Sequence, residues 1–126
     1  MIKHVNDNAD DWAKLWNKEV QLGIIPYYMF VERDTGAKNY FEVPLAEAYR
    51  IYREAMKQVS GLARTARGPS MSAGPGKVEV QGSTEIYGEK VCVRRFIQAR
   101  NPTWVHLRLF PRYSGTAPSL HLTEPA

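Results

Sequence analysis

The sequence predicts an α/β fold, and three features of the chain lead to this prediction. Residues 1–60 alternate short apolar runs with segments of helical periodicity, the βαβα pattern of strands joined by helices in a parallel sheet. Residues 64–77 are rich in glycine and proline, which indicates a loop. Residues 78–100 alternate apolar and polar side chains, which is typical of a β-hairpin. We therefore expect a single domain over residues 1–126, with a βαβα part at 1–60, a Gly/Pro-rich loop at 61–77, a hairpin at 78–100 and a mostly irregular tail at 101–126.

The first part is expected to contain two strands and two helices. Residues 2–5 form a short apolar strand, and residues 24–31 form an eight-residue apolar run of the kind found in strands covered on both faces. The first helix ends at Gly23, and the second begins at Pro44 and ends near Gly61. Their apolar faces contain Trp12, Leu15, Trp16 and Val20 in the first helix and Leu45, Ala48, Tyr49, Tyr52, Ala55, Met56 and Val59 in the second.

The second part is expected to contain two antiparallel strands. They are predicted at residues 77–81 and 90–99, with turn signals at Gly82-Ser83 and Gly88-Glu89. Four prolines follow Asn101, so that we expect mostly irregular structure there.

Composition excludes several classes of protein. The chain has a net charge of +4, and residues 61–126 hold nine basic and four acidic side chains, which favours an anionic ligand for this half. The single cysteine, Cys92, excludes an intrachain disulfide, a CxxC zinc site and a cysteine-held iron–sulfur cluster. The longest apolar run is too short for a membrane helix, and the acidic N-terminal residues do not resemble a signal peptide. We therefore expect a cytoplasmic protein with no membrane partner.

The glycine-rich loop is the strongest candidate for chemistry. Its GPGK sequence holds Gly74, Gly76 and Lys77. Backbone N–H groups of such a loop can bind an anion, and its lysine can pair with a phosphate or form a Schiff base with an aldehyde cofactor. Arg64 and Arg67, upstream of the loop, could add phosphate contacts. The P-loop pattern GxxxxGK[ST] is not met, so a simple turn with a solvated lysine stays open.

Other chemistry is less favoured by the sequence. The three histidines are far apart, which argues against a metal site, and Cys92 in an alternating strand is more typical of a packed residue than of a nucleophile. Arginines also interleave with aromatic residues, a pattern found in proteins that bind RNA or single-stranded DNA. The solvated face of a sheet shows the same pattern. We therefore do not expect nucleic acid as a partner. The residues concerned are His4, His106 and His121 for the metal and Arg94, Arg95, Phe96, Arg100, Trp104, Arg108, Phe110, Arg112 and Tyr113 for nucleic acid.

Three stretches resemble a known family. They are LGIIPYYMFVERDTGAKNYFEVPL at 22–45, SGLARTARGPSMSAGPGKVEVQG at 60–82 and GEKVCVRRFIQARNP at 88–102. Together they resemble the C-terminal portion of the lysine 2,3-aminomutase-like radical SAM proteins, whose reaction is the 1,2-migration of an amino group. The likeness runs from about Ile2 to Pro102, some four-fifths of the chain.

The resemblance implies a fold and a cofactor site. It implies two βα units of an incomplete α/β barrel, followed by the glycine-rich loop and a small β-hairpin extension. It also implies that Lys77 is the pyridoxal phosphate lysine, with Gly74, Gly76, Arg64 and Arg67 around the cofactor. Asp34 is implied as a substrate-binding residue, in slightly shifted register.

The chain also departs from the family pattern. The CxxxCxxC motif and the SAM-binding strands have no counterpart in these 126 residues, so we expect neither an iron–sulfur cluster nor SAM, and no aminomutase activity from this chain alone. Lysine-acting members have an aspartate seven residues before the cofactor lysine, whereas this chain has Ser70. This difference argues against lysine as the substrate.

Three interpretations follow, of which a basic nucleic-acid binder is the least favoured. In the first, the chain is the C-terminal cofactor-binding and assembly fragment of such an enzyme, and it binds pyridoxal phosphate weakly or not at all in isolation. In the second, it is a free-standing, non-catalytic homo-oligomeric or ligand-binding module descended from that family. Because an apolar strand such as IIPYYMFV needs neighbours, we expect a homo-oligomer, with a separate radical SAM chain as an open alternative partner.

Overall fold

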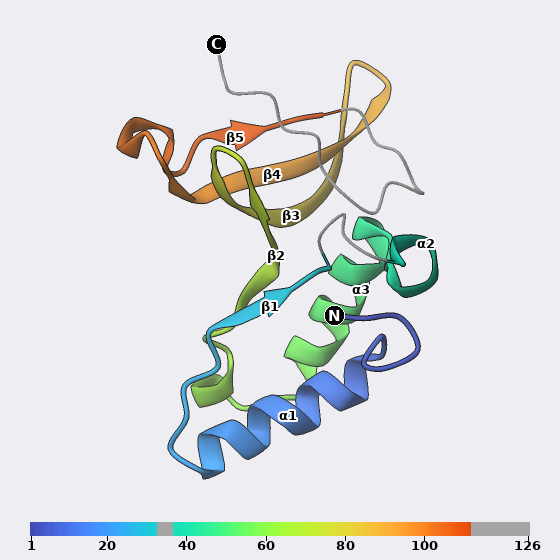
Figure 1. Ribbon diagram of the computed structural model, residues 1–126, viewed down its shortest axis with the longest axis vertical. Helices are drawn as coiled ribbons and strands as arrows, with labels where there is room; N and C mark the ends of the chain where they lie inside the picture. Colours follow the sequence, from blue (N-terminus) through green and yellow to red (C-terminus); the bar gives the residue numbers. More distant parts are fainter. Residues whose placement is uncertain (33–36, 112–126) are drawn as a thin grey trace.

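The computed structural model describes residues 1–32 and 37–111, and it has a mixed α/β architecture. One five-stranded sheet has the order β1-β2-β3-β4-β5, and helices α1 and α3 lie beside its β1 end (Figure 1). The helices are α1 (Ala9–Gln21), α2 (Lys38–Phe41) and α3 (Leu45–Lys57), with 3₁₀ turns at Gly61–Ala63 and Pro102–Trp104; the strands are β1 (Tyr28–Phe30), β2 (Arg67–Ala73), β3 (Gly76–Ile86), β4 (Glu89–Ala99) and β5 (Arg108–Leu109).

The α/β prediction is confirmed at this level, although the sheet is mixed and not parallel throughout. Strands β1 and β2 are parallel, with α2 and α3 in the connection between them, and all later pairings are antiparallel. The strand predicted at residues 2–5 is wrong, because the Ile2 carbonyl accepts from the amides of Val5 and Asn6 and folds this segment into a turn. Only one complete βαβ unit is therefore present in the described residues, and the incomplete barrel stays a prediction.

Both long helices were predicted, and local chemistry explains where they start. The Asn8 side chain accepts from the Asp11 amide at 2.9 Å, and Asp10 and Asp11 lie at the positive end of the α1 dipole. Pro44 precedes α3, as expected from its fixed φ.

The Gly/Pro-rich loop predicted at residues 61–77 is largely wrong, since residues 67–73 of it form the second strand of the sheet. Strand β2 pairs with β1 on one side and with β3 on the other. Pro69 is tolerated because the β1–β2 register shifts between Tyr28 and Phe30, which leaves an irregularity where a proline without an N–H fits. Only Gly74 and Pro75 remain as a two-residue turn between β2 and β3.

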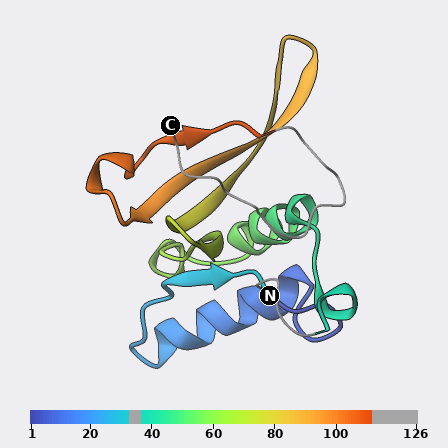
Figure 2. The same cartoon turned by 45° about the horizontal axis from the view of Figure 1, so that its top comes forward.

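The hairpin is confirmed, but it is longer than predicted. Gly82-Ser83 is not a turn: Gly82 lies inside β3 at a register shift, where its φ of +124° and the nearby Tyr49 ring require glycine. The turn signal at Gly88-Glu89 is correct, because the chain reverses through Tyr87 and Gly88. The tip of this hairpin extends away from the rest of the molecule (Figure 2). Of the predicted tail, residues 101–111 hold a 3₁₀ turn and the short β5, and residues 112–126 lie outside the described part.

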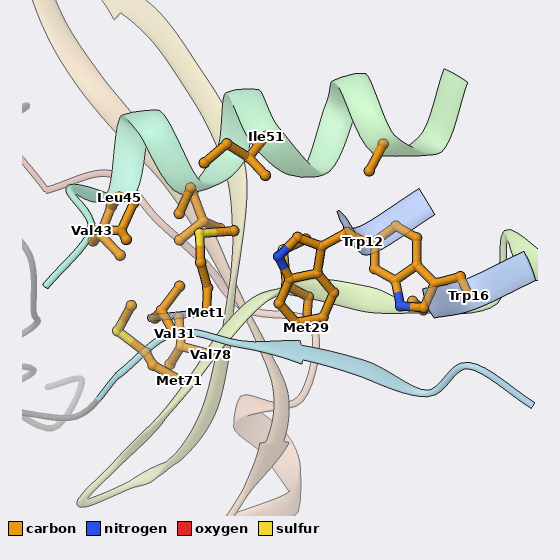
Figure 3. Packing of buried hydrophobic residues seen from close by; sticks show 14 of the residues in the cluster. Met1, Trp12, Trp16, Met29, Val31, Val43, Leu45, Ile51, Met71 and Val78 are labelled. Atoms are coloured by element: carbon orange, nitrogen blue, oxygen red, sulfur yellow. The ribbon is translucent and has the colours of Figure 1, made fainter. Parts of the chain in front are cut away.

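The hydrophobic core lies between α1, α3 and one face of the sheet. Trp12 and Trp16 of α1 lie between α3 and β1, and Met29 of β1 and Ile51 of α3 are fully buried beside them (Figure 3). Within the described residues, no helix is both long and apolar enough to cross a bilayer.

The opposite face of β1 is not covered by these helices. Residues 24–31 were expected to be buried on both faces, yet in β1 Phe30 is 41% exposed and Tyr28 is half-buried, while Met29 between them is fully buried. Tyr27, which precedes the strand, is 62% exposed. This half-covered strand sets the environment of the candidate site.

Candidate functional site

Lys77 lies on the face of the sheet that carries the exposed aromatic residues. It follows the β2–β3 turn and pairs with Ser72 of β2 and Gln98 of β4. Its neighbour Val78 points into the core and is fully buried, so the Lys77 side chain points to the other face. There its Nζ atom lies 4.9 Å from the ring centroid of Tyr28 and 5.5 Å from that of Phe30. We call this side of the sheet the aromatic face, defined by Tyr28, Phe30, Ser70 and Lys77.

The aromatic rings form a continuous row beside the lysine. Ring centroids are 4.3 Å apart for Tyr27 and Tyr28 and 4.9 Å apart for Tyr28 and Phe30. These separations are those of aromatic pairs that attract one another. The row gives Lys77 an apolar wall on one side, and its ammonium group is attracted by the ring faces.

Arg67 reaches the same row of rings from the start of β2. Its guanidinium carbon lies 6.0 Å from the centroid of the Tyr27 ring. Burial and a hydrogen bond with Tyr27 raise the pKa of the Tyr28 hydroxyl, whereas the nearby Arg67 guanidinium lowers it in part. Tyr28 is therefore protonated at neutral pH, with Arg67 near its hydroxyl and Lys77 near its ring.

The two glycines of the GPGK sequence differ in whether the structure requires glycine at their positions. At Gly76, where φ is +157°, an added Cβ would lie 2.1 Å from the Gln98 carbonyl oxygen, so glycine is required by the close approach of β4. At Gly74 an added Cβ would meet no atom within 4 Å. The turn, Lys77 and residues 98–100 border an open groove of about 330 Å³. Gly74 and Gly76 thus lie beside Lys77, but the need for Gly76 is explained by strand pairing alone.

The other predicted arginine, Arg64, bonds to the backbone elsewhere in the chain. The Nε atom of Arg64 donates to the Val59 carbonyl at 3.2 Å, in the connection between α3 and β2. Asp34 lies outside the described residues. Across residues 1–32 and 37–111, no group of three or more His, Cys, Asp or Glu side chains could hold a metal ion.

Two of the described arginines considered for nucleic acid are not free on the surface. Arg94 and Phe96 are buried, and the Arg95 guanidinium pairs with Glu79 at 2.7 Å. Arg112 and Tyr113 lie outside the described part.

Sequence reasoning missed that Tyr28 and Phe30 would be the neighbours of Lys77. The alternation in YYMF contained a usable signal, because residues 28 and 30 must share a face opposite Met29. The sequence alone does not show that β1 pairs in parallel with β2. This pairing brings the rings of Tyr28 and Phe30 within reach of Lys77 on β3.

Comparison with known proteins gives partial matches. The chain is 31% identical over 85 residues to a putative L-lysine 2,3-aminomutase of Aquifex aeolicus, which covers 68% of this chain and 22% of that protein. It is 38% identical over 61 residues to the L-lysine 2,3-aminomutase of Escherichia coli, which covers 48% of this chain and 18% of that protein. The chain is related to these aminomutases. It spans about a fifth of their length. No family model and no solved structure matches it.

Proposed function

We propose that this chain is the cofactor-binding and assembly part of a lysine 2,3-aminomutase-like protein, with Lys77 as the amine that holds pyridoxal phosphate. The observation that supports this most directly is the position of the Lys77 amine over the rings of Tyr28 and Phe30, on the face that the helices leave uncovered.

The residues around Lys77 fit this cofactor. The ring faces of Tyr28 and Phe30 offer an apolar wall to a flat heterocycle, and Arg67 together with the hydroxyls of Tyr27 and Tyr28 offers donors and positive charge to a phosphate. Pyridoxal phosphate, when bound, supplies an electron sink for chemistry at the carbon next to an amino group. Arg64, whose Nε bonds to a carbonyl elsewhere, is left out of this proposal.

In this arrangement each side chain has a definite task. Lys77 provides the nucleophilic amine, and the ring faces of Tyr28 and Phe30 exclude water from one side of it. The Arg67 guanidinium holds the anionic end of the cofactor. Ser70 is fully buried and lies two residues along β2 from Ser72, the partner of Lys77. It brings no carboxylate toward a second substrate amine, so we propose an amino-acid substrate other than lysine.

Catalysis by this chain alone is not part of the proposal. Its 126 residues contain one cysteine, whereas a CxxxCxxC cluster needs three from one segment. We propose that the aromatic face is covered in the assembled protein, by a second copy of the chain or by a separate radical SAM chain. Tyr27 and Phe30 are the exposed aromatic residues that such a partner would bury.

A free-standing, non-catalytic oligomeric module is the second candidate. The exposure of Tyr27 and Phe30 favours it as well, because covering these rings requires association but no cofactor. The two candidates differ in whether Lys77 reacts selectively with pyridoxal phosphate.

Trapping the cofactor on the protein tests the proposal. The chain is mixed with pyridoxal phosphate, reduced with borohydride and digested, and the labelled peptides are identified by mass spectrometry. We expect the label on Lys77, its loss in Lys77→Ala, and about tenfold more cofactor to be needed in Arg67→Met, since a charge-assisted hydrogen bond contributes about 1.5–3 kcal/mol.

Lys14→Ala, which removes an exposed lysine of α1, is the matched control and should leave the label unchanged. Label spread over Lys3, Lys14 and Lys18, and unaltered by Lys77→Ala, would contradict the cofactor role and leave the non-catalytic module. Light scattering on the same preparations measures whether the chain associates with itself.

A further inference from the structure

A second cavity lies away from Lys77, between the start of α3 and strands β3 and β4. Its volume is about 60 Å³, and its walls include Leu45, Ala46 and Tyr49 from α3 and Ser83, Cys92 and Arg94 from the two strands. Among the residues that the structure describes, no acidic side chain lines it. None of these residues belongs to the proposed cofactor site.

Arg94 is the unusual member of this cavity. It is only 5% exposed, and its Nε donates to the Cys92 Sγ at 3.4 Å. In the described part of the chain it forms no ion pair, whereas its neighbour Arg95 pairs with Glu79. A largely buried guanidinium without a counter-ion attracts anions, and an anion bound in the cavity would form a charge-assisted hydrogen bond with it.

The start of helix α3 adds a second source of positive potential. This 13-residue helix follows Pro44, and no side chain caps its first turn. Its first backbone bond runs from the Ala48 amide to the Pro44 carbonyl, so the amides of Leu45 and Ala46 find no partner within the helix. The N-terminus of a helix attracts anions through such amides and through the helix dipole. Leu45 and Ala46 are the residues of that turn that border the cavity.

The size of the cavity limits what it can hold. A water molecule needs about 10–15 Å³ on this measure, so that 60 Å³ accepts roughly four to six waters or one small oxyanion. A nucleotide or a peptide is too large. We propose that this cavity binds a small oxyanion, a carboxylate or a phosphate group, through Arg94 and the first turn of α3, with the Ser83 hydroxyl at its rim.

Titrations of the ¹⁵N-labelled chain with inorganic phosphate, acetate and chloride at constant ionic strength test this proposal by NMR. We expect saturable shifts at the amides of Ala46 and Ser83 and at the Arg94 Nε–H with phosphate or acetate, but not with chloride. The order of affinity of phosphate and acetate separates a tetrahedral from a planar ligand. Arg94→Met should weaken binding at least tenfold. Arg108→Met, which removes an exposed arginine from β5, is the matched control and should leave binding unchanged.

Thermal unfolding gives an independent readout. At ten times the dissociation constant, the oxyanion should raise the Tm of the wild-type chain by about 5 °C and leave that of Arg94→Met unchanged. Without oxyanion, Arg94→Met should melt at the same temperature or higher, since it removes an unpaired buried charge.

Equal shifts in Arg94→Met, or NMR shifts scattered over the basic surface, would overturn the proposal and indicate an adventitious ion only. If Arg94→Met does not fold, the NMR shifts of the wild-type chain alone test the proposal, because it requires the largest shifts to lie at the first turn of α3. Selective labelling of Lys77 by pyridoxal phosphate in Arg94→Met shows whether the two sites are independent, so that either proposal can fail without the other.

Discussion

Met29 and Phe30 are neighbours in β1, yet their surroundings differ completely. Met29 is fully buried among the tryptophans of α1 and the apolar residues of α3, whereas Phe30 is 41% exposed beside the Lys77 amine. The helix-covered face is packed as a core, while the aromatic face combines rings with cationic side chains. The comparison teaches that one strand stabilises the core through one set of alternate residues and, in the function we propose, offers a ligand-binding face through the other.

The largest expected effect comes from truncating these two neighbours. Met29→Ala leaves a cavity in the core and should lower the free energy of unfolding by about 2–5 kcal/mol. Phe30→Ala removes a partly solvated ring and a cation–π partner of Lys77, and should cost less than about 1.5 kcal/mol. Urea unfolding followed by tryptophan fluorescence measures both. Equal losses would mean that the aromatic face is covered in solution, and the comparison of the two faces would fail.

A smaller effect separates the two glycines of the turn. Gly76→Ala forces a Cβ against the Gln98 carbonyl at a positive φ, so that we expect a loss of about 2–4 kcal/mol in the free energy of unfolding. Gly74→Ala has open space and should change it by less than about 0.5 kcal/mol. Urea unfolding checks this pair. A Gly74→Ala variant that unfolds normally but no longer accepts pyridoxal phosphate at Lys77 would assign Gly74 to the ligand.

The parts of the fold that were predictable are those governed by local periodicity. Helices α1 and α3 follow from apolar residues at helical spacing, and the β3–β4 hairpin follows from alternation over residues 90–99. Strand β2 was missed because Gly68 and Pro69 are breakers in most contexts. Its pairing with strands on both sides, and the register irregularity beside Pro69, outweigh this local tendency.

The candidate site was predictable in its central residue but not in its surroundings. GPGK marked Lys77, and composition marked Arg67 as a basic neighbour. The positions of the rings of Tyr28 and Phe30 depend on the pairing of residues about forty positions apart, such as Phe30 with Ser70, which no local pattern specifies. The sequence places Arg94 in a basic, alternating strand, and nothing in its neighbourhood shows that it is buried or that it shares a cavity with the first turn of α3.

The smallest expected effect concerns a tyrosine on the covered side. The Tyr52 hydroxyl donates to the Ala66 carbonyl at 3.0 Å, and its ring packs edge-on against Trp16. Burial raises the pKa of Tyr52, and the charge of Glu79 raises it further. The folded chain therefore holds this proton more tightly than the unfolded chain, whose tyrosine titrates near 10. This contribution is complete below pH 10 and is lost as the pH rises through the folded pKa.

Tyr52→Phe removes both the hydrogen bond and the titration. At pH 7 the variant should be less stable than the wild-type chain by about 1 kcal/mol, which is the usual contribution of one hydrogen bond. Above pH 10 the difference in the free energy of unfolding should shrink. Only the wild-type chain has a buried phenol whose ionisation destabilises the folded state. Urea unfolding at pH 7, 9 and 10.5 measures the change. Tyr87→Phe, at the exposed tip of the hairpin, is the control and should match the wild-type chain at every pH. A difference for Tyr52→Phe that stays constant across this range would show that water reaches the Tyr52 hydroxyl, and the covered side would then be less closed than its packing indicates.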